Sequence, residues 1–321
     1  MPTLITGSFA YDTIMVFHDR FKNHILPEHA HILNVSFLVP DLRREFGGCA
    51  GNIAYNLKLL GGDPLPMGTV GGDFAPYRAW LEKNRIDLTH VTEAPGTFTA
   101  QAFVTTDRDN NQITAFHPGA MAHAHRNRIS DAAGIDFGII APDGREAMIE
   151  HAAQLKAAGI PFIFDPGQGL PMFTGAELNA FIDQATYIVV NDYESELLRE
   201  KTGRDLEQIA ARVEALVITR GADGADIYAA PAAGTGTARD AVHIDAARID
   251  QARDPTGCGD AFRAGLLYGL VHRLDWRTCG QIASLMGGIK AEQHGTQNHR
   301  FSKAEFEAMY RDNFGAALRL A

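Results

Sequence analysis

The chain has 321 residues, of which 45% are hydrophobic and 21% are charged, and its formal net charge is −10. This composition is typical of a globular protein with one large domain or two domains, and the lack of a basic block argues against nucleic acid or a membrane surface as a partner. The three cysteines lie far apart and no stretch is as apolar as a membrane span, so we expect a cytoplasmic protein without disulfides or structural zinc.

Hydrophobic periodicity predicts alternating strands and helices along most of the chain. Buried apolar runs predict strands at 3–6, 65–70, 137–141, 161–165, 187–190, 216–219, 226–229 and 242–245. Apolar residues three and four apart predict helices at 53–60, 74–84 (with Asp73 as N-cap), 143–158, 176–184, 194–201, 277–291 and 302–312, and another within the unit 254–273. Repeated β-α-β units favour an α/β fold with a Rossmann-like, mostly parallel central sheet and helices on both faces.

Two stretches interrupt this pattern with short alternating runs, one at 13–17 and 32–39 and the other a hairpin at 97–105 and 113–117. We expect both to join one small β-sheet lid. The lid then comprises 11–47 and 96–118, and the large catalytic domain comprises 1–10, 48–95 and 119–321. Exposed apolar residues such as Phe37 and Leu38 need a cover, from a ligand or from a second subunit, so we expect a homodimer through the lid sheet.

The stretch 254–260, DPTGCGD, is the strongest candidate for chemistry. It is a glycine-bearing turn that runs into a helix. Gly257 and Gly259 leave the backbone bare, and the unpaired N–H groups of a helix N-terminus bind anions such as phosphate. Asp260, in the first helical turn, is placed to take a proton from a hydroxyl that attacks phosphorus. The alternative is an ordinary helix start with an acidic cap.

Two groups of residues follow predicted strands at the sheet edge. Asn191 and Glu194 are spaced to order waters on Mg²⁺, or to form a capping box at the start of a helix. The stretch 219–225, which includes Thr219, Gly221 and Gly224, joins two strands, and its two glycines would let a purine ring lie against the backbone. The alternative for these three is an ordinary strand–turn–strand connection.

Two further groups suggest a sugar and a flat ring. Asp12, Gly48 and Asn52 are suited to the hydroxyls of a sugar, since a carboxylate and an amide accept and donate hydrogen bonds. Phe103 and Phe116 would sandwich a base, although two aromatic residues on adjacent strands are also typical of sheet packing.

Taken together, these pieces resemble the ribokinase (PfkB) family of carbohydrate and nucleoside kinases. The resemblance rests on 47–54 (GGCAGNIA), on 254–262 (DPTGCGDAF) and on Asn191 and Glu194 between them, in the family's order, and it covers about residues 3–297. Within the family, the stretches 26–31, 36–42, 116–121 and 165–168 look most like bacterial adenosine kinases and broad-specificity nucleoside kinases.

This resemblance implies an enzyme that uses ATP and Mg²⁺ to phosphorylate the 5′-hydroxyl of a nucleoside, adenosine first, with inosine, guanosine and cytidine as further candidates. Asp260 would be the base, and the amides of Gly257, Cys258, Gly259 and Asp260 the anion hole. The other implied roles are nucleoside binding by Ser8, Asp12, Gly48, Asn52, Phe103, Phe116 and Gln168, contact with ATP by Asn191, Thr219, Gly221 and Gly224, Mg²⁺ binding through water by Glu194, and a monovalent cation such as K⁺ at Asp254.

Cys258 departs from the family pattern, which has Ala or another small residue at this position. A thiol at a helix N-terminus is expected to have a lowered pKa, so we expect alkylation of Cys258 to inactivate the protein and ATP to protect it. Two rival functions stay open, namely a ribokinase-like sugar kinase and a non-catalytic nucleoside sensor on the same scaffold.

Overall fold

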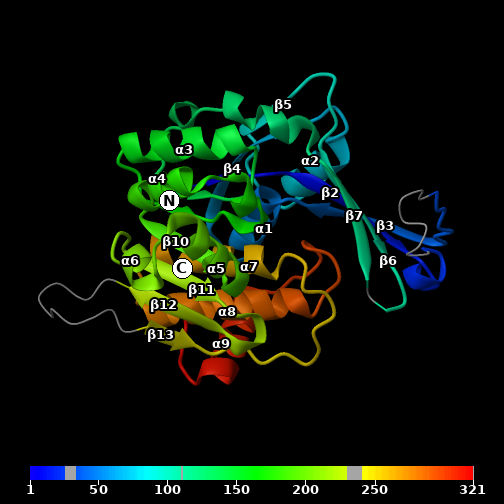
Figure 1. Cartoon of the computed structure of the whole chain (residues 1–321). Coiled ribbons are helices and arrows are strands. Elements are labelled where there is room, and N and C mark those ends of the chain that lie inside the picture. The colour runs from blue at the N-terminus through cyan, green and yellow to red at the C-terminus, as the bar shows by residue number, and fades with distance from the viewer. Residues whose placement is uncertain (26–33, 110, 230–240, 321) are drawn as a thin grey trace, which may run out of the picture.

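The computed structural model describes residues 1–25, 34–109, 111–229 and 241–320, and contains two β-sheets flanked by helices (Figure 1). The large sheet has nine strands in the order β13-β12-β11-β10-β9-β8-β1-β4-β5, and the small sheet has four in the order β3-β2-β6-β7. Every neighbouring pair in the large sheet is parallel except those of β12 with β11 and with β13. The predicted α/β architecture with a small second sheet is therefore confirmed.

The element bounds follow the predicted alternation closely. The strands of the large sheet are β1 Pro2–Thr6, β4 Asp63–Val70, β5 His90–Glu93, β8 Phe137–Ile140, β9 Phe162–Phe164, β10 Tyr187–Asn191, β11 Ala215–Thr219, β12 Ala225–Ala229 and β13 Ala241–Ile244. Those of the small sheet are β2 Ala10–Val16, β3 Asp41–Gly47, β6 Ala100–Thr106 and β7 Gln112–His117. The α-helices are α1 Cys49–Leu59, α2 Ala75–Lys83, α3 Arg145–Ala157, α4 Gly175–Gln184, α5 Asp192–Thr202, α6 Leu206–Ala210, α7 Cys258–Val271, α8 Trp276–Ala291 and α9 Lys303–Phe314. Short 3₁₀ helices lie at Phe21–Asn23, Gly119–Arg126, Ile129–Asp131, Gly167–Met172 and Gly221–Asp223.

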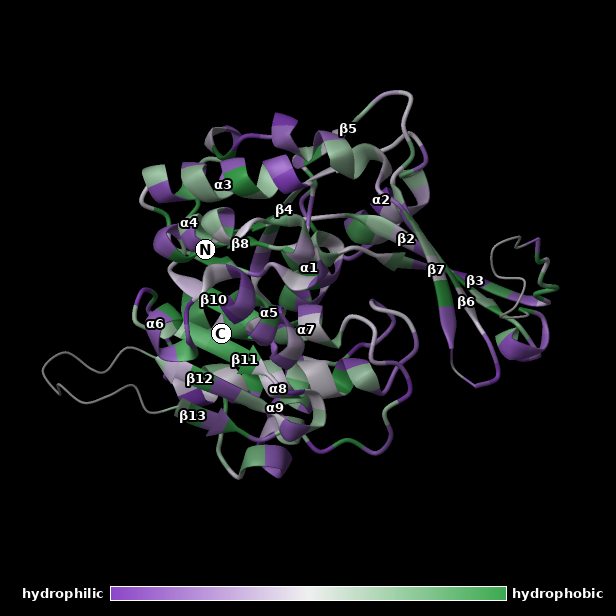
Figure 2. Cartoon of the chain, viewed as in Figure 1, coloured by the Kyte–Doolittle hydropathy of each residue, from purple (hydrophilic) through white to green (hydrophobic). Residues whose placement is uncertain are grey.

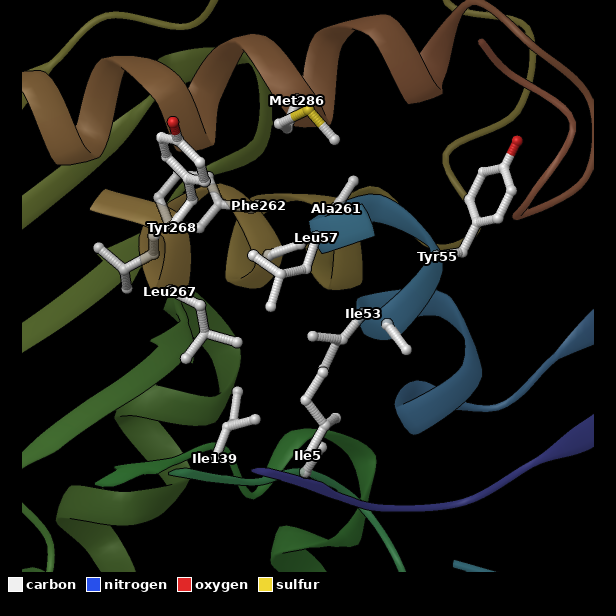
Figure 3. Packing of buried hydrophobic residues seen from close by; sticks show 14 of the residues in the cluster. Ile5, Ile53, Tyr55, Leu57, Ile139, Ala261, Phe262, Leu267, Tyr268 and Met286 are labelled. Atoms are coloured by element: carbon white, nitrogen blue, oxygen red, sulfur yellow. The ribbon is translucent and has the colours of Figure 1, made fainter. Parts of the chain in front are cut away.

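Successive residues of the central strands enter two separate apolar layers, because side chains alternate between the faces of a sheet. Ile5 and Ile139 belong to the layer under α1, α2, α7, α8 and α9, whereas their neighbours Leu4 and Ile140 belong to the layer under α3 to α6. Figure 2 shows the result as strongly hydrophobic central strands beneath helices such as α3 that carry polar outer faces. The first layer is seen closely in Figure 3, which labels Ile5, Ile139, Ile53, Leu57, Ala261, Leu267 and Met286 among others.

The strand order reverses beside β1. From β1 the chain proceeds to β4 and β5 on one side, and then to β8, β9, β10 and β11 on the other. The loops that leave β1 and β8 meet at this point, where the backbone N–H of Ser8 donates to the carbonyl of Pro142 at 3.0 Å. A reversal of strand order opens a crevice at the carboxyl ends of parallel strands, and this is where such sheets bind ligands.

The small sheet projects from the body of the molecule (Figure 1). Its described strands confirm the predicted run at 13–17 and the predicted hairpin. The strand predicted at 32–39 is wrong over 34–39, and 32–33 lie outside the described residues. Pro40 lacks a donor for a sheet ladder and the strand begins after it, while Phe37 packs on Phe17 and Phe21.

One local prediction is wrong and one strand was not predicted. Asp73 is not the N-cap of α2, because Phe74 holds that position. The Asp73 carboxylate instead accepts hydrogen bonds from the Thr99 backbone N–H at 2.7 Å and from the Gln101 side chain at 3.2 Å. It therefore ties the start of α2 to strand β6. Strand β5 was not predicted, since its four residues are too few to show a period.

Candidate active site

A cleft of about 940 Å³ lies between the carboxyl edge of the large sheet and the small sheet. The predicted site residues that line it are Ser8, Asp12, Gly48, Asn52, Phe116, Gln168, Asn191, Glu194, Thr219, Gly221, Gly257, Cys258, Gly259 and Asp260. Phe103, Gly224 and Asp254 do not line it. The fold thus collects residues from distant parts of the chain around one space large enough for two small ligands.

The turn before α7 presents free amides to this cleft. Gly257 has a φ of +80°, and a side chain there would also crowd Thr296, so glycine suits the turn. Among the described hydrogen bonds, none uses the backbone N–H of Gly257, Gly259 or Asp260 as a donor. The prediction of four working amides is wrong for Cys258, whose N–H donates to the carbonyl of Pro255 at 3.1 Å. Three amides and the positive end of α7 are left to bind an anion.

Asp260 is held in place by a chain of side-chain amides. Asn52 Nδ2 donates to Asp260 Oδ2 at 2.8 Å, and Gln297 Nε2 donates to Asn52 Oδ1 at 2.9 Å. Burial raises the pKa of Asp260 to about 6, the hydrogen bond from Asn52 acts against this rise, and the Asp165 carboxylate adds to it. A carboxylate with a pKa near the working pH, fixed beside an anion site, is suited to general-base chemistry.

Asp12 enters the cleft from the small sheet. Burial, followed by the nearby carboxylates of Glu45 and Asp254, raises the pKa of Asp12 to about 6. The backbone leaves room for this side chain, because a Cβ added at Gly47 would lie 2.4 Å from Asp12 Oδ2. Gly48 has a φ of +85°, and a Cβ there would lie 2.5 Å from the carbonyl oxygen of Ser8. Asp12, Gly48 and Asn52 all line the cleft, as a hydroxyl-binding group requires.

The prediction that Phe103 and Phe116 of this chain flank one ring is wrong. In the antiparallel pair of β6 with β7, Phe116 lies opposite Ala102 and Phe103 lies opposite Ala115. Directly opposed residues share a face of a sheet and successive residues alternate, so the two phenylalanines point to opposite faces. Phe116 faces the cleft together with Ala102 and Thr114, whereas Phe103 faces away from it.

Asn191 and Glu194 form a capping box at the start of α5. Asn191 Oδ1 accepts from the Glu194 N–H at 2.7 Å, and Glu194 Oε2 accepts from the Asn191 N–H at 2.8 Å. Within the described hydrogen bonds, Glu194 Oε1 is not engaged, and the residue lines the cleft. A carboxylate oxygen of this kind fits Mg²⁺, which takes few protein ligands and keeps several waters. The capping role and a Mg²⁺ role are therefore compatible.

Close packing explains why residue 224 is a glycine. Its φ is +85°, and a Cβ there would lie 2.0 Å from the carbonyl oxygen of Ile244. Glycine is needed because the backbone of the next strand passes too close for a side chain. The prediction that Gly224 lies along ATP receives no support from this position, whereas Thr219 and Gly221 do line the cleft.

A buried ion pair in the cleft was not predicted. Arg263, one turn into α7 and 5% exposed, donates from Nε and Nη2 to both oxygens of Asp165 at 3.0 Å. Among the cleft-lining residues that the structure describes, Arg263 is the single cation beside six carboxylates, those of Asp12, Asp143, Asp165, Asp192, Glu194 and Asp260. The two partners lie 98 positions apart, so no local pattern could have revealed the pair.

Asp143 was also missed as a site residue. It follows strand β8 at the carboxyl edge, and that position is the signal that could have found it. Burial raises its pKa to about 7, against the opposing hydrogen bond from the Gly144 N–H, and its Oδ2 atom is buried with no hydrogen-bond partner among the described residues. The protonated form of this carboxyl group is therefore well populated at neutral pH.

The predicted reactivity of Cys258 is not supported. Burial raises the pKa of the Cys258 thiol, and the nearby Lys290 charge only opposes this rise. The sequence shows the helix N-terminus but not this loss of hydration, which acts on the thiol pKa in the opposite direction. The structure therefore gives no support to an unusually reactive thiol at Cys258.

The family profile described as pfkB family carbohydrate kinase matches residues 10–303. The chain belongs to the PfkB family. A nucleoside kinase of Methanocaldococcus jannaschii is 30% identical over 269 residues, which cover 83% of this chain and 85% of that relative. The prediction of a phosphotransferase that acts on a hydroxyl group is confirmed for this PfkB kinase.

Solved structures of PfkB kinases agree with this assignment. The nucleoside kinase of Burkholderia thailandensis in complex with inosine is 51% identical, superposes with a TM-score of 0.88 and covers 99% of both chains. The same enzyme in complex with ADP and inosine has a TM-score of 0.86 and covers 99% of this chain and 98% of its own. Among the described residues of our PfkB kinase, no helix is long and apolar enough to cross a membrane.

Proposed function

We propose that this PfkB kinase transfers the γ-phosphoryl group of ATP to the 5′-hydroxyl of a ribonucleoside. The observation that carries the proposal is the position of Asp260, which Asn52 holds beside three free amides in a cleft with room for two ligands. The similarity to a kinase solved with ADP and inosine supports a nucleoside acceptor. Adenosine is our first candidate, and inosine is the next.

In this proposal the residues of the chain act mainly by positioning and by charge. Asp12, Gly48 and Asn52 bind the ribose hydroxyls, and Ser8, Phe116 and Gln168 contact the base. Asp260 accepts the proton of the attacking hydroxyl. The amides of Gly257, Gly259 and Asp260 receive the negative charge of the transferred group, and closure of the small sheet excludes water.

Glu194, through water, and Asn191 would hold Mg²⁺, which when bound neutralises charge on the phosphate oxygens. Six acidic residues line the cleft and would repel ATP in their charged forms, so we expect a divalent cation to be needed there. Thr219 and Gly221 would lie along the nucleotide. Free thiols and the use of ATP both suit a cytoplasmic enzyme.

The decisive experiment measures ADP formation from Mg-ATP with adenosine, inosine, guanosine, cytidine, ribose and fructose 6-phosphate. The proposal requires the highest kcat/KM with a nucleoside. A preference for ribose or fructose 6-phosphate would favour the sugar kinase. Tight nucleoside binding without ADP formation would instead identify a sensor.

The acid limb of the pH profile should report Asp260. Its carboxylate works only when deprotonated, and its pKa is about 6, so kcat/KM should fall as the pH decreases through about 6. At about one pH unit above this pKa, kcat/KM should have reached its maximum. Asn52→Leu removes the hydrogen bond that favours the charged form, so its acid limb should move to higher pH. Asp12 titrates in the same range, so Asp12→Asn serves to separate the two groups. Full activity at pH 5 would contradict the assignment.

Phe116 and Phe103 form a matched pair for testing base contact. Phe116→Ala should raise the nucleoside KM by roughly 5- to 150-fold, because stacking of a base on an aromatic ring contributes about 1–3 kcal/mol. Phe103→Ala removes the same ring from the opposite face and should change KM by less than about threefold. Steady-state kinetics decides the case, and equal effects of the two variants would place the base elsewhere.

We further propose that residues 11–47 and 96–118 act as a lid and that two lids pair in a homodimer. The motivation differs in part from that of the sequence, because Phe37 packs on Phe17 and Phe21, whereas Leu38 is 85% exposed as expected. In addition, Leu42, Phe103 and Ile113 are 64%, 39% and 43% exposed and share the sheet face turned away from the cleft. Light scattering should give twice the chain mass, and Leu42→Asp should lower it. A wild-type monomer at working concentration would refute the dimer.

A further inference from the structure

Lys290 is a completely buried lysine near the active site that takes no part in the chemistry described so far. It lies in the last turn of α8 and is 0% exposed. Its ammonium donates to the carbonyl of Asp254 at 2.8 Å and to the carbonyl of Gln293 at 3.0 Å. Lysine is rarely buried to this extent unless its charge has partners, so these contacts call for an explanation.

The two carbonyls belong to the two loops that frame the anion site. Asp254 begins the segment that leads to the free amides of Gly257, Gly259 and Asp260, and Gln293 begins the loop that reaches Thr296. Thr296 lines the cleft, and its side chain lies 3.0 Å from where a Cβ at Gly257, the N-cap of α7, would sit. The Lys290 ammonium therefore joins both loops at a point just behind the anion site.

The Asp254 carboxylate acts on this ammonium through its charge, without a direct ion pair to it among the described residues. Its Oδ1 accepts from the Thr256 N–H at 2.9 Å and its Oδ2 accepts from the Gly295 N–H at 3.0 Å. Burial acts to raise the pKa of Asp254, but these N–H groups and the Lys290 charge lower it overall. The carboxylate is thus ionised and already bonded through both oxygens.

A free monovalent cation at Asp254, as expected from the sequence, does not fit this arrangement. Both carboxylate oxygens are engaged, the Arg43 guanidinium lies 3.7 Å from Oδ2, and the Asp254 carbonyl is bound by an ammonium. Carbonyl oxygens bind K⁺ by replacing its hydration shell, and an ammonium group is a compact point charge that can satisfy the same oxygens.

We propose that the Lys290 ammonium is the built-in cation of this site, which holds the anion-binding turn in place and makes phosphoryl transfer independent of any free monovalent cation. This inference rests on the proposed function for its kinetic consequence. Its structural consequence, that the protein has no use for K⁺ at Asp254, stands apart from catalysis.

The first test compares the wild-type enzyme in K⁺ with the same enzyme in tetramethylammonium, at constant Mg²⁺ and ionic strength. We expect kcat to differ by less than about twofold and the melting temperature to be unchanged. A kcat that is about tenfold or more higher in K⁺, or a melting temperature that rises with K⁺ concentration, would overturn the proposal. Because the wild-type protein is used, this test does not depend on the folding of a variant.

The second test removes the charge with Lys290→Met. In tetramethylammonium the variant should lose at least about tenfold in kcat, with a smaller change in the nucleoside KM, and added NH₄⁺ or K⁺ should restore part of both kcat and melting temperature. Lys201→Met is the matched control, because Lys201 also donates to two carbonyls, those of Pro171 and Phe173, away from the anion site. A loss in Lys290→Met without cation rescue, or equal rescue of both variants, would contradict the built-in cation.

The two proposals can fail separately. If no nucleoside is phosphorylated in any buffer, the proposed function is wrong, and the melting temperatures still decide the role of Lys290. If nucleosides are phosphorylated only in K⁺, the proposed function holds and the inference about Lys290 is wrong.

Discussion

Asp260→Asn is expected to lower kcat by about 100-fold to 10,000-fold, the range that removal of a positioned general base covers. The amide keeps the shape of the side chain and can still accept from Asn52 Nδ2, so the cleft should retain its geometry. Because Asn cannot take the proton of the attacking hydroxyl, the loss should appear in kcat, while the affinity for ATP changes little. Rapid-quench kinetics with saturating nucleoside would measure the chemical step directly.

The same variant should be more stable than the wild type near pH 8. The pKa of Asp260 in the folded protein, about 6, lies above its ordinary value, so at higher pH the charged form opposes folding. That penalty is present above the folded pKa and disappears as the pH falls below the ordinary value. A neutral amide removes it, and the melting temperature should rise. Such an increase, together with lost activity, is the behaviour of a residue selected for function and not for stability.

Asp192→Asn is the matched control, since Asp192 lines the same cleft but is exposed at the start of α5. This change should leave kcat within about threefold of the wild type. An Asp260→Asn variant that keeps a tenth or more of the wild-type kcat would exclude Asp260 as the base. A comparable loss in both variants would point to the overall charge of the cleft instead.

Arg263→Gln should lower the free energy of unfolding by about 3–5 kcal/mol, the cost of removing one partner of a buried ion pair. The guanidinium bonds both oxygens of Asp165 and lies within 4.0 Å of Glu194, so its loss leaves buried carboxylates without a cation. Urea unfolding at neutral pH would measure the change. The activity should fall as well, because none of the described cleft-lining residues then carries a cation to face ATP.

The double variant Asp165→Asn/Arg263→Gln separates the ion pair from the packing of its side chains. If the unpaired charge causes the loss, the neutral pair should recover most of the stability that Arg263→Gln removes. Arg212→Gln, which breaks the exposed pair with Asp183, is the control and should cost about 1 kcal/mol or less. A loss below about 1 kcal/mol for Arg263→Gln itself would mean that water enters the cleft and replaces the missing partner.

The fold was largely predictable because its signals are local. A strand that is buried on both faces, such as β10, shows as an apolar run, and a helix such as α8 shows as a repeat of apolar residues. The alternation of these elements dictates a mostly parallel sheet. Short elements are the exception, since β5 has too few residues to show a period. A proline can also shift the start of a strand, since β3 begins only after Pro40.

The anion-binding turn could be predicted for the same reason. Gly257 needs its left-handed backbone, and the free amides of α7 follow from the start of a helix, so both depend on a few adjacent residues. The number of amides that remain free could not be predicted, because the hydrogen bond from the Cys258 N–H to the Pro255 carbonyl depends on how the turn closes.

What the sequence determined by itself is therefore the alternating fold, the turn at 254–260 and the residue types that gather around it. Only the tertiary structure decided which side chains meet and how much water they retain. The strand register turned Phe103 away from the cleft, and the approach of β9 to α7 brought Asp165 to Arg263. Burial raised the pKa of Cys258 and left the Lys290 ammonium with backbone carbonyls as its partners. The physical reason is that dihedral preferences and hydrophobic periods act over a few residues, whereas facing, pairing and desolvation depend on segments that are distant in the chain.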